Sequence, residues 1–449
     1  MKLHTKILLG LALGGTAGIA ANLAAPGAPW IDAVNRYVTG PAGQIFLRLL
    51  FMVVIPLVFS TLSLGVAGLG DLRNLGRVGA KTLAFFLLST ALAAALGLTL
   101  VNLVRPGEGL PADTVSRLQD LYSGQAQQRF ASSGAGEFGI DTFVNIVPRN
   151  PVRAAADMQM LSLIFFSIVF GVALALIPAE RAAPMVRVLE SLAEAVTKII
   201  ELAMRLAPYG VFALIFVVTS TFGWSLLRQL ALYVVVVLLG LALHATVTLS
   251  ALVRGLAGLR PTRFWSKIRE VAITAFSTSS SNATLPTTLL VAERNLRIPP
   301  KIGGFVLPLG ATMNMNGTAL FEGVTVLFVA QVFGIELTLA KQAIIVVLSV
   351  LTAIGTAGVP GGSIPLLMMM ATSVGVPGEG IAIILGVDRI LDMSRTVPNV
   401  AGDLTAACFV ARSEGLWDPR DAEADADAEA FPQLPLDDSP TTEYEPPAL

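Results

Sequence analysis

The fold is decided by the stretch Asp388-Arg389-Ile390-Leu391-Asp392-Met393-Ser394-Arg395-Thr396-Val397-Pro398-Asn399-Val400-Ala401-Gly402-Asp403. It lies in the otherwise apolar segment 378–410, which is long enough to cross a bilayer as a helix. At about 100° per residue, the polar side chains of this stretch share an arc of about 100° on one helix face. Small polar residues can gather on one face for helix packing alone. Ionisable residues at this depth are expensive, however, so the stripe predicts a functional site.

The charges of the stripe indicate what this site binds. Asp388, Asp392 and Asp403 face a single guanidinium from Arg395, which leaves a formal charge of −2. An uncompensated buried ion costs several kcal/mol, so we expect the site to take up cations. Arg395 could form only a structural ion pair, but its planar fork also suits bidentate capture of a ligand carboxylate. An anionic ligand together with cations would leave the site near neutrality.

Composition places the remainder of the chain in a membrane. Its 449 residues are 54% hydrophobic and 14% charged, whereas globular chains carry about 25% charged residues. One cysteine and two histidines exclude a disulfide framework and a thiolate metal cluster, and they leave little for histidine-based catalysis. We therefore expect no enzyme, no cofactor and no nucleic-acid partner. An intramembrane protease is disfavoured because no paired catalytic aspartates on separate spans stand out.

Hydropathy predicts an all-α polytopic membrane protein with eight transmembrane helices and two re-entrant helical hairpins arranged as inverted repeats. The predicted spans are 6–25, 44–69, 81–104, 161–177, 193–219, 226–253, 303–333 and 378–410. The two hairpins are the apolar stretches 264–291 and 337–372, interrupted at 279–282 and 355–362. The first span could instead be a cleaved signal peptide, because Lys2 and Lys6 precede it.

Positive residues set the predicted orientation. Lysines and arginines gather at the N-terminus and after the second, fourth and sixth spans, which with eight spans all fall on one side. Both termini are then cytoplasmic in a cell (inner) membrane, and the loop 105–160 is extracellular. From Glu414 to Leu449 there are eleven acidic residues and one basic residue, with little apolar surface. We predict a disordered acidic tail over 413–449, with a binding peptide as the alternative.

A second polar interruption, Asn314-Met315-Asn316-Gly317-Thr318, lies in the seventh span. It can unwind one helical turn and free backbone carbonyls, which are hard oxygen ligands suited to an alkali cation. Glu322 follows on the same face, and lipid-like surroundings favour its protonated form. Glu322 is therefore a candidate proton carrier, with a permanently neutral glutamic acid as the alternative.

The two hairpins complete a repeated pattern, in which a hairpin precedes a helix interrupted by polar residues. Half-helix ends at 279–284 and 355–362 would direct backbone N–H groups at an anion. Such repeat pairs mark the substrate sites of secondary transporters. An ion channel would need a continuous polar pore lining, whereas these polar residues cluster.

Four motifs in this order resemble the glutamate/aspartate transporters of the dicarboxylate/amino acid:cation symporter family. They are Ser279-Ser280-Ser281-Asn282-Ala283-Thr284-Leu285-Pro286, Asn314-Met315-Asn316-Gly317-Thr318-Ala319-Leu320, Gly355-Thr356-Ala357-Gly358-Val359-Pro360-Gly361 and the stripe quoted first. The resemblance covers about 6–413 and implies a homotrimer in a lipid bilayer, with a transport domain that moves against a scaffold. It assigns 1–76 and 161–225 to the scaffold, and 77–104 and 226–412 to the transport domain.

The resemblance also implies roles for single residues. Arg395 would hold the side-chain carboxylate of an acidic amino acid, Asp392 and Thr396 its amino group, and Asn399 its α-carboxylate. Thr318, Ser281 and Val359 would close the pocket. One sodium site would use Gly310, Asn314, Asn399 and Asp403, and a second would use carbonyls of Thr312, Ala353, Ile354 and Thr356.

Departures from the family's pattern bear on the coupling ion. Sodium-coupled members use an Asp and a Tyr for a third sodium site, where this chain has Asn316 and Phe86. Glu322 matches the acidic position of the proton-coupled members. We therefore favour symport of glutamate or aspartate with H⁺, and Na⁺ as a further coupling ion. A sodium-coupled dicarboxylate or neutral amino acid symporter is the alternative. The family's extra arginine is absent at Ser279 and Met393, and we interpret Arg389 as its substitute.

Overall fold

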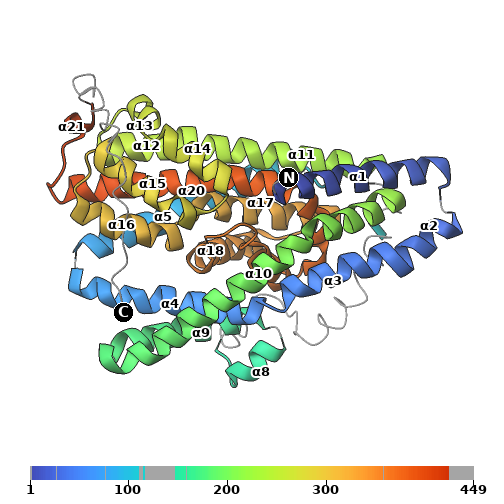
Figure 1. Cartoon of the computed structure of the whole chain (residues 1–449), viewed down its shortest axis with the longest axis horizontal. Helices are drawn as coiled ribbons and strands as arrows, with labels where there is room; N and C mark the ends of the chain where they lie inside the picture. The colour runs from blue at the N-terminus through green and yellow to red at the C-terminus, as the bar shows by residue number, and fades with distance from the viewer. Residues whose placement is uncertain are drawn as a thin grey trace, which may run out of the picture.

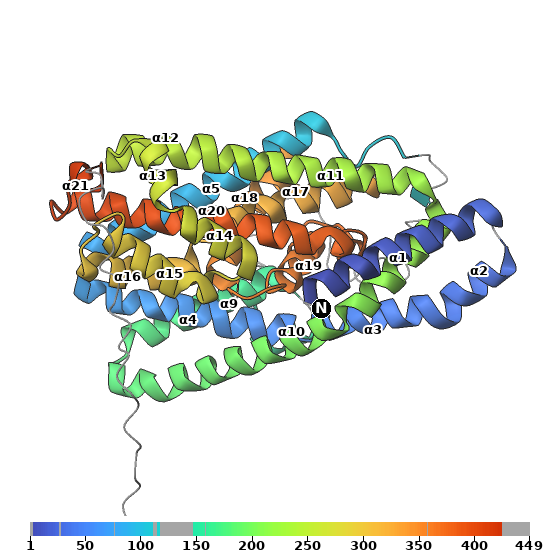
Figure 2. The same ribbon diagram turned by 45° about the horizontal axis from the view of Figure 1, so that its top comes forward.

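The computed structural model describes residues 3–26, 28–75, 77–110, 115–116, 147–157, 159–356 and 358–423. Over these residues it consists of helices and their connections and has no strand (Figures 1 and 2). Most of the predicted extracellular loop, at 117–146, and the tail from 424 lie outside the described residues. The predicted all-α architecture is confirmed.

The described residues of the first half of the chain include six helices of more than ten residues. The elements are α1 (Leu3–Ala24), α2 (Pro29–Val34), η1 (Asn35–Thr39), α3 (Gly40–Phe51), α4 (Val54–Leu75), α5 (Arg77–Val104), α8 (Pro151–Ala156), α9 (Met160–Leu176) and α10 (Ala179–Phe222). Helix α10 has 44 residues and includes Arg181 and Arg187, which we predict in a loop. That prediction is wrong because the helix continues past its apolar part as an amphipathic extension, a form typical of a helix that leaves the bilayer.

The second half holds both hairpins and the central helices. Its elements are α11 (Trp224–Leu243), η2 (His244–Leu249), α12 (Ser250–Leu252), η3 (Val253–Ala257), α13 (Pro261–Lys267), α14 (Arg269–Thr278), α15 (Ser281–Arg294), α16 (Pro300–Met313), α17 (Asn316–Val332), α18 (Leu339–Gly355), α19 (Ile364–Ser373), η4 (Gly378–Ile383), α20 (Leu385–Ser413) and α21 (Pro419–Glu423). Helix α17 is buried along nearly its whole length. The sole cysteine, Cys408, is buried on α20.

Within the described part of the chain, six helical stretches are long and apolar enough to cross a membrane. They are 5–24, 29–67, 77–104, 179–222, 226–257 and 300–332. The other two predicted spans also lie on helices, namely the shorter α9 and the polar-striped α20. The chain is therefore a multi-pass membrane protein.

Both predicted hairpins fold back on themselves at the interrupted positions. In the first, Ser279 adopts a left-handed φ of 53° that ends α14, and the Ser280 hydroxyl accepts from the Ala283 N–H to cap α15. At the open end, the Asn295 amide donates to the Lys267 carbonyl at 2.9 Å, so the two arms are antiparallel. The second hairpin consists of α18 and α19. Its arms pack near their middles, where Ser349 Oγ lies 3.6 Å from Met370 Sδ.

The two polar helices differ from each other. The predicted break in the seventh span is present, because α16 ends at Met313 and α17 begins at Asn316. The predicted interruption of the last span is wrong, because α20 runs unbroken from Leu385 to Ser413 with Pro398 inside it. Its polar side chains lie on one helix face, so they do not disturb the backbone hydrogen bonds. The irregular segment is instead the short 3-10 helix η4 before it.

The first part of the predicted disordered tail is packed. Trp417 is 7% exposed, and its indole N–H donates to the Leu296 carbonyl at 2.8 Å. Glu414 pairs with Arg77 and Lys81 at 2.7 Å each, and hydrogen bonds from these two side chains lower the pKa of Glu414 to about 2. Disorder from residue 413 is therefore wrong as far as 423. Acidic composition alone overlooks the burial that one tryptophan provides.

Packing separates two groups of helices that meet along one face. Helices α1, α3, α4, α9 and α10 pack on one another, and α10 crosses the molecule beside α3 and α1 (Figure 1). Helices α5, α11, α14–α17 and α20 form the second group, in which α5 lies against α17 (Figure 2). The second group, together with the hairpin of α18 and α19 that packs on α5 and α17, carries the site described next.

Candidate functional site

A small cavity lies where both hairpin tips, the break before α17 and the middle of α20 converge. Its lining residues are Ser279, Ser281, Met315, Thr318, Thr356, Gly358, Val359, Ser363, Asp392, Arg395, Thr396 and Asn399. All seven residues that we predict at the substrate pocket are among them. The structure therefore brings together, around one cavity, segments that are more than 100 residues apart in the sequence.

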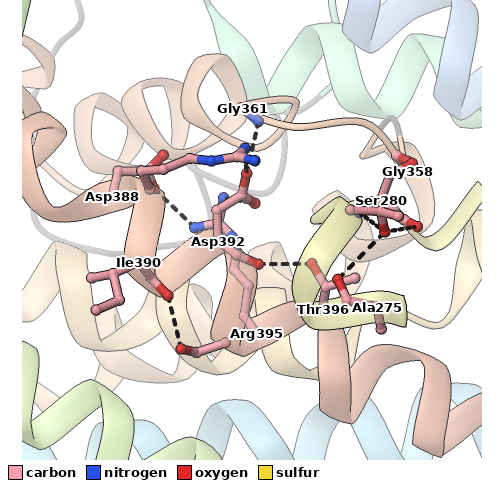
Figure 3. A network of polar contacts seen from close by, with 12 residues as sticks. Ala275, Ser280, Gly358, Gly361, Asp388, Ile390, Asp392, Arg395 and Thr396 are labelled. Carbon is pink, nitrogen blue, oxygen red and sulfur yellow. Dashed lines mark hydrogen bonds and ion pairs between the residues drawn. The ribbon is translucent and has the colours of Figure 1, made fainter. Parts of the chain in front are cut away.

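Arg395 is the centre of the charged part of this cavity, although it is only 2% exposed. Its Nη1 lies 3.0 Å from Asp388 Oδ1 and its Nη2 lies 2.7 Å from Asp392 Oδ1 (Figure 3). Its guanidinium carbon lies 4.1 Å from the centroid of the Phe321 ring, a distance at which a cation–π attraction acts. Packing and two ion pairs thus fix the orientation of the fork.

Asp392 has partners on both carboxylate oxygens. Besides Arg395 on Oδ1, its Oδ2 accepts from the Gly361 N–H at 3.1 Å and lies 3.5 Å from Nη1 of Arg389. Two arginines therefore offset Asp388 and Asp392, and the predicted charge of −2 is wrong for the site as a whole. The helical wheel omitted Arg389 because its backbone lies off the polar face, but its long side chain reaches back to that face. Asp403, whose Oδ1 accepts from the Asn314 amide, remains as the carboxylate of the stripe without an ion pair among the described residues.

The two hairpin tips touch each other. The Ser280 hydroxyl donates to the Gly358 carbonyl (Figure 3). The Asn282 N–H donates to the same oxygen at 3.4 Å. A Cβ added at Gly358 would lie 2.9 Å from the Asn282 side chain, so only glycine permits this close approach. The contact closes one side of the cavity.

Asn399 organises the start of α17. Its Oδ1 accepts from the N–H groups of Gly317 and Thr318 at 2.8 and 3.2 Å, and its Nδ2 donates to Thr318 Oγ1 at 3.1 Å. These N–H groups are the ones that a helix N-terminus leaves unsatisfied. The side chain of α20 therefore caps α17 and holds its positive end beside the cavity.

The four residues of the predicted first cation site lie near one another around Asp403. Asn314 Nδ2 donates to Asp403 Oδ1 at 2.9 Å, and Ser89 Oγ donates to Asn314 Oδ1 at 3.2 Å. Gly310 lies so close that an added Cβ would be 2.5 Å from Asp403 Oδ1. Asn399 precedes Asp403 by one turn of α20. Asp403 is therefore a buried carboxylate that lies beside the Asn314 amide and the backbone of Gly310.

The predicted second cation site is less compact. Ala353, Ile354 and Thr356 lie together at the end of α18, and Thr312 lies on α16, which packs against α18. The Thr356 hydroxyl donates to the Thr352 carbonyl at 2.7 Å. At the predicted defective third site, the side-chain amide of Asn316 is fully buried and has no hydrogen-bond partner among the described residues.

Glu322 is buried on α17, behind the cavity. Its Oε2 lies 2.6 Å from the Thr352 hydroxyl, while its Oε1 has no partner within the described part of the chain. The same hydroxyl lies 2.8 Å from the Leu348 carbonyl, a bond that it can make only with its single proton. When that proton goes to Leu348, Glu322 must itself donate to Thr352. This geometry therefore accommodates a protonated carboxyl.

Sequence reasoning missed several residues at the site. Ser363 is 2% exposed, lines the cavity and has a hydroxyl without a hydrogen-bond partner among the described residues. The hydroxyl of Ser279 shares all three properties. Ser363 precedes α19, so the rule that serine favours helix N-caps could have located it. No sequence signal pointed to Phe321 or Ser89.

Comparisons with known proteins agree with this architecture. A family model described as sodium:dicarboxylate symporter family matches residues 3–413. The proton/glutamate-aspartate symporter of Escherichia coli (strain K12) is 38% identical over 417 residues, covering 93% of this chain and 94% of the relative. The proton/sodium-glutamate symport protein of Bacillus subtilis (strain 168) is 36% identical over 94% of this chain and 95% of its own length.

A further relative carries a different substrate in its name. The C4-dicarboxylate transport protein of Granulibacter bethesdensis is 33% identical over 88% of this chain and 86% of its own length. These names describe transporters and not enzymes. The chain belongs to the sodium:dicarboxylate symporter family.

Proposed function

We propose that this protein is a secondary active symporter that takes up acidic amino acids, glutamate or aspartate, together with cations. The observation that carries the proposal is Arg395, a buried guanidinium fork that faces a small cavity between two aspartates. Such a fork suits a ligand carboxylate. The names of the E. coli and B. subtilis relatives support the same substrates and a coupled ion.

Each end of an acidic amino acid has a counterpart in the cavity. Arg395 receives the side-chain carboxylate, and Asp392 with Thr396 receives the ammonium group. The α-carboxylate binds beside Asn399 at the N-terminus of α17, with Thr318, Ser281 and Val359 around the ligand. An aspartate at the ammonium position favours an amino acid over a dicarboxylate. A dicarboxylate substrate is the second candidate, supported by the name of the Granulibacter relative.

Two cation roles follow from the buried carboxylates. Glu322 carries a proton, because the Thr352 hydroxyl beside it can accept as well as donate a hydrogen bond. Na⁺ binds at Gly310, Asn314, Asn399 and Asp403, where a buried carboxylate supplies the negative charge and a hard oxygen ligand. The second set, at Thr312, Ala353, Ile354 and Thr356, binds a further Na⁺ through backbone carbonyls.

The assembly and the membrane placement belong to the same proposal. The protein works as a homotrimer in the cell (inner) membrane, with both termini cytoplasmic. Residues 1–76 and 161–225 form a scaffold, and 77–104 and 226–412 form the transport domain, which carries the cavity across. The contact face between the two helix groups supports this division.

Uptake into proteoliposomes tests the proposal. We expect inward aspartate transport under an imposed proton gradient, and Arg395→Ala abolishes it because the ligand carboxylate loses its partner. Arg412→Ala is the control, because Arg412 is an exposed arginine on the same helix that donates to the Leu256 carbonyl. Unchanged aspartate uptake by Arg395→Ala would refute the site. Parallel runs with sodium-only and proton-only gradients identify the coupling ion.

A further inference from the structure

Arg389 links the substrate cavity to the face between the two helix groups. It lies one residue after Asp388 on α20, its side chain is 12% exposed, and its Nη1 is 3.5 Å from Asp392 Oδ2. Arg395 binds the opposite oxygen of the same carboxylate. Asp392 is thus held between two guanidinium groups.

The surroundings of Arg389 are mainly apolar. On its other side, it lines a second small cavity whose remaining members are Ile7, Phe46, Met204, Ala207, Val211, Ile364, Leu385 and Asp388. Its Nε is buried and has no hydrogen-bond partner among the described residues. A charge in such surroundings is retained only when it is paired. Asp392 is therefore the partner that keeps Arg389 in place.

We propose that Arg389 is a positioning residue that competes with the ammonium group of the substrate for Asp392, and so sets the preference between acidic amino acids and dicarboxylates. This inference rests on the proposed function. An ammonium group that approaches Asp392 meets an oxygen already used by Arg389 and by the Gly361 N–H. The ammonium group must therefore displace Arg389 or share the carboxylate with it. Either event lowers the free energy that is gained when the ammonium group binds.

Charge balance gives the sign of the effect. Asp388, Asp392, Arg389 and Arg395 together carry no net formal charge in the empty cavity. Aspartate adds one negative charge, whereas succinate at neutral pH adds two and offers no ammonium to Asp392. Arg389 therefore favours succinate and disfavours aspartate. Removing the charge of Arg389 should therefore weaken succinate binding and strengthen aspartate binding. The ratio of the two affinities then changes more than either affinity alone.

Calorimetric titration of the purified full-length protein in nanodiscs tests this prediction with aspartate and succinate. For Arg389→Gln, we expect the affinity for aspartate relative to succinate to rise about tenfold, the size of one charge-assisted hydrogen bond. Arg389→Lys keeps the cation and should retain a ratio close to that of the wild type. Arg412→Gln, on the same helix, controls for the loss of an arginine elsewhere.

An unchanged ratio in Arg389→Gln overturns the inference. The inference is also overturned if Arg389→Gln and Arg389→Met remain monodisperse but lose affinity for aspartate and succinate equally. That result would mean that Arg389 only supports the structure of the site. Wild-type protein that binds neither ligand overturns the proposed function and this inference with it. Wild-type binding of aspartate with an unchanged ratio in the variant overturns this inference alone.

Discussion

At the scale of single residues, the cavity contains buried hydroxyls that could donate hydrogen bonds to a ligand. The hydroxyls of Ser363 and Ser279 are buried and have no hydrogen-bond partner among the described residues. Leaving a buried polar group unpaired costs about 1–3 kcal/mol. A bound carboxylate would accept from such a hydroxyl, which makes both serines contributors to affinity.

We expect Ser363→Ala to weaken aspartate binding by about tenfold, because a hydrogen bond to a charged group is worth about 1.5–3 kcal/mol. Titration of the purified protein measures this change. Ser373→Ala is the matched control on α19, since its hydroxyl already donates to the Met369 carbonyl. Equal affinities for wild type and Ser363→Ala would show that the hydroxyl does not contact the ligand.

Glu322→Gln should make transport insensitive to an imposed pH gradient while aspartate still binds. The amide keeps a donor for Thr352 but cannot release a proton. Uptake measured at equal sodium concentrations with and without a pH gradient separates the two effects. A variant that responds to the gradient as the wild type does would exclude Glu322 as the carrier.

At the scale of elements, close approach at the break between α16 and α17 depends on glycine. A Cβ added at Gly402 on α20 would overlap the Asn316 side chain, and one at Gly317 would overlap the Arg395 carbonyl oxygen. The break between α16 and α17 can therefore pack on α20 only because these positions have no side chain. The capping of α17 by Asn399 depends on the same contact.

Gly402→Ala should lower the melting temperature of the purified protein and weaken aspartate binding together, because separating α17 from α20 disrupts both packing and the Asn399 cap. Gly255→Ala is the control, since a Cβ there meets no atom within 4 Å. Thermal unfolding followed by tryptophan fluorescence measures stability. If Gly402→Ala melts and binds as the wild type does, the packing argument is wrong.

Sequence reasoning predicted the helical segments and seven of the residues that line the cavity, because hydropathy and intramembrane polarity are local signals. It predicted the break before α17 from Asn314 to Thr318 but wrongly expected one in α20. Polar side chains on one helix face leave the backbone intact, whereas a glycine beside two amides does not. It also miscounted the charge, since the reach of Arg389 depends on a side-chain rotamer. Contacts between distant segments, such as Ser280 with Gly358, have no counterpart in local patterns.

At the scale of the whole molecule, the segment after α20 ties distant helices together. Glu414 joins the end of α20 to the start of α5 through Arg77 and Lys81. Three residues later, Trp417 joins it to the loop after α15 through the Leu296 carbonyl. The three contacts bind helices of the second group into one body at the end opposite α2 (Figure 1).

Glu414→Gln should lower the melting temperature at neutral pH, because the ion pairs with Arg77 and Lys81 are lost. Its pKa falls from 4.5 to about 2 on folding, so the ionised form stabilises the protein above about pH 4.5. This contribution is lost as the pH falls toward 2, and the difference from the wild type should then vanish. A gap between the two melting curves that persists unchanged to that pH would contradict the ion-pair explanation.

The single cysteine of this protein has a practical value for measuring its motions. Cys408 lies within α20 and is inaccessible to reagents in the surrounding water. The natural sequence can therefore serve as the background for attaching probes. Two cysteines introduced on the exposed surfaces of α10 and α11 could carry a pair of fluorophores or spin labels, with little labelling at the native thiol. Changes in the distance between them would test the proposed movement of one helix group against the other.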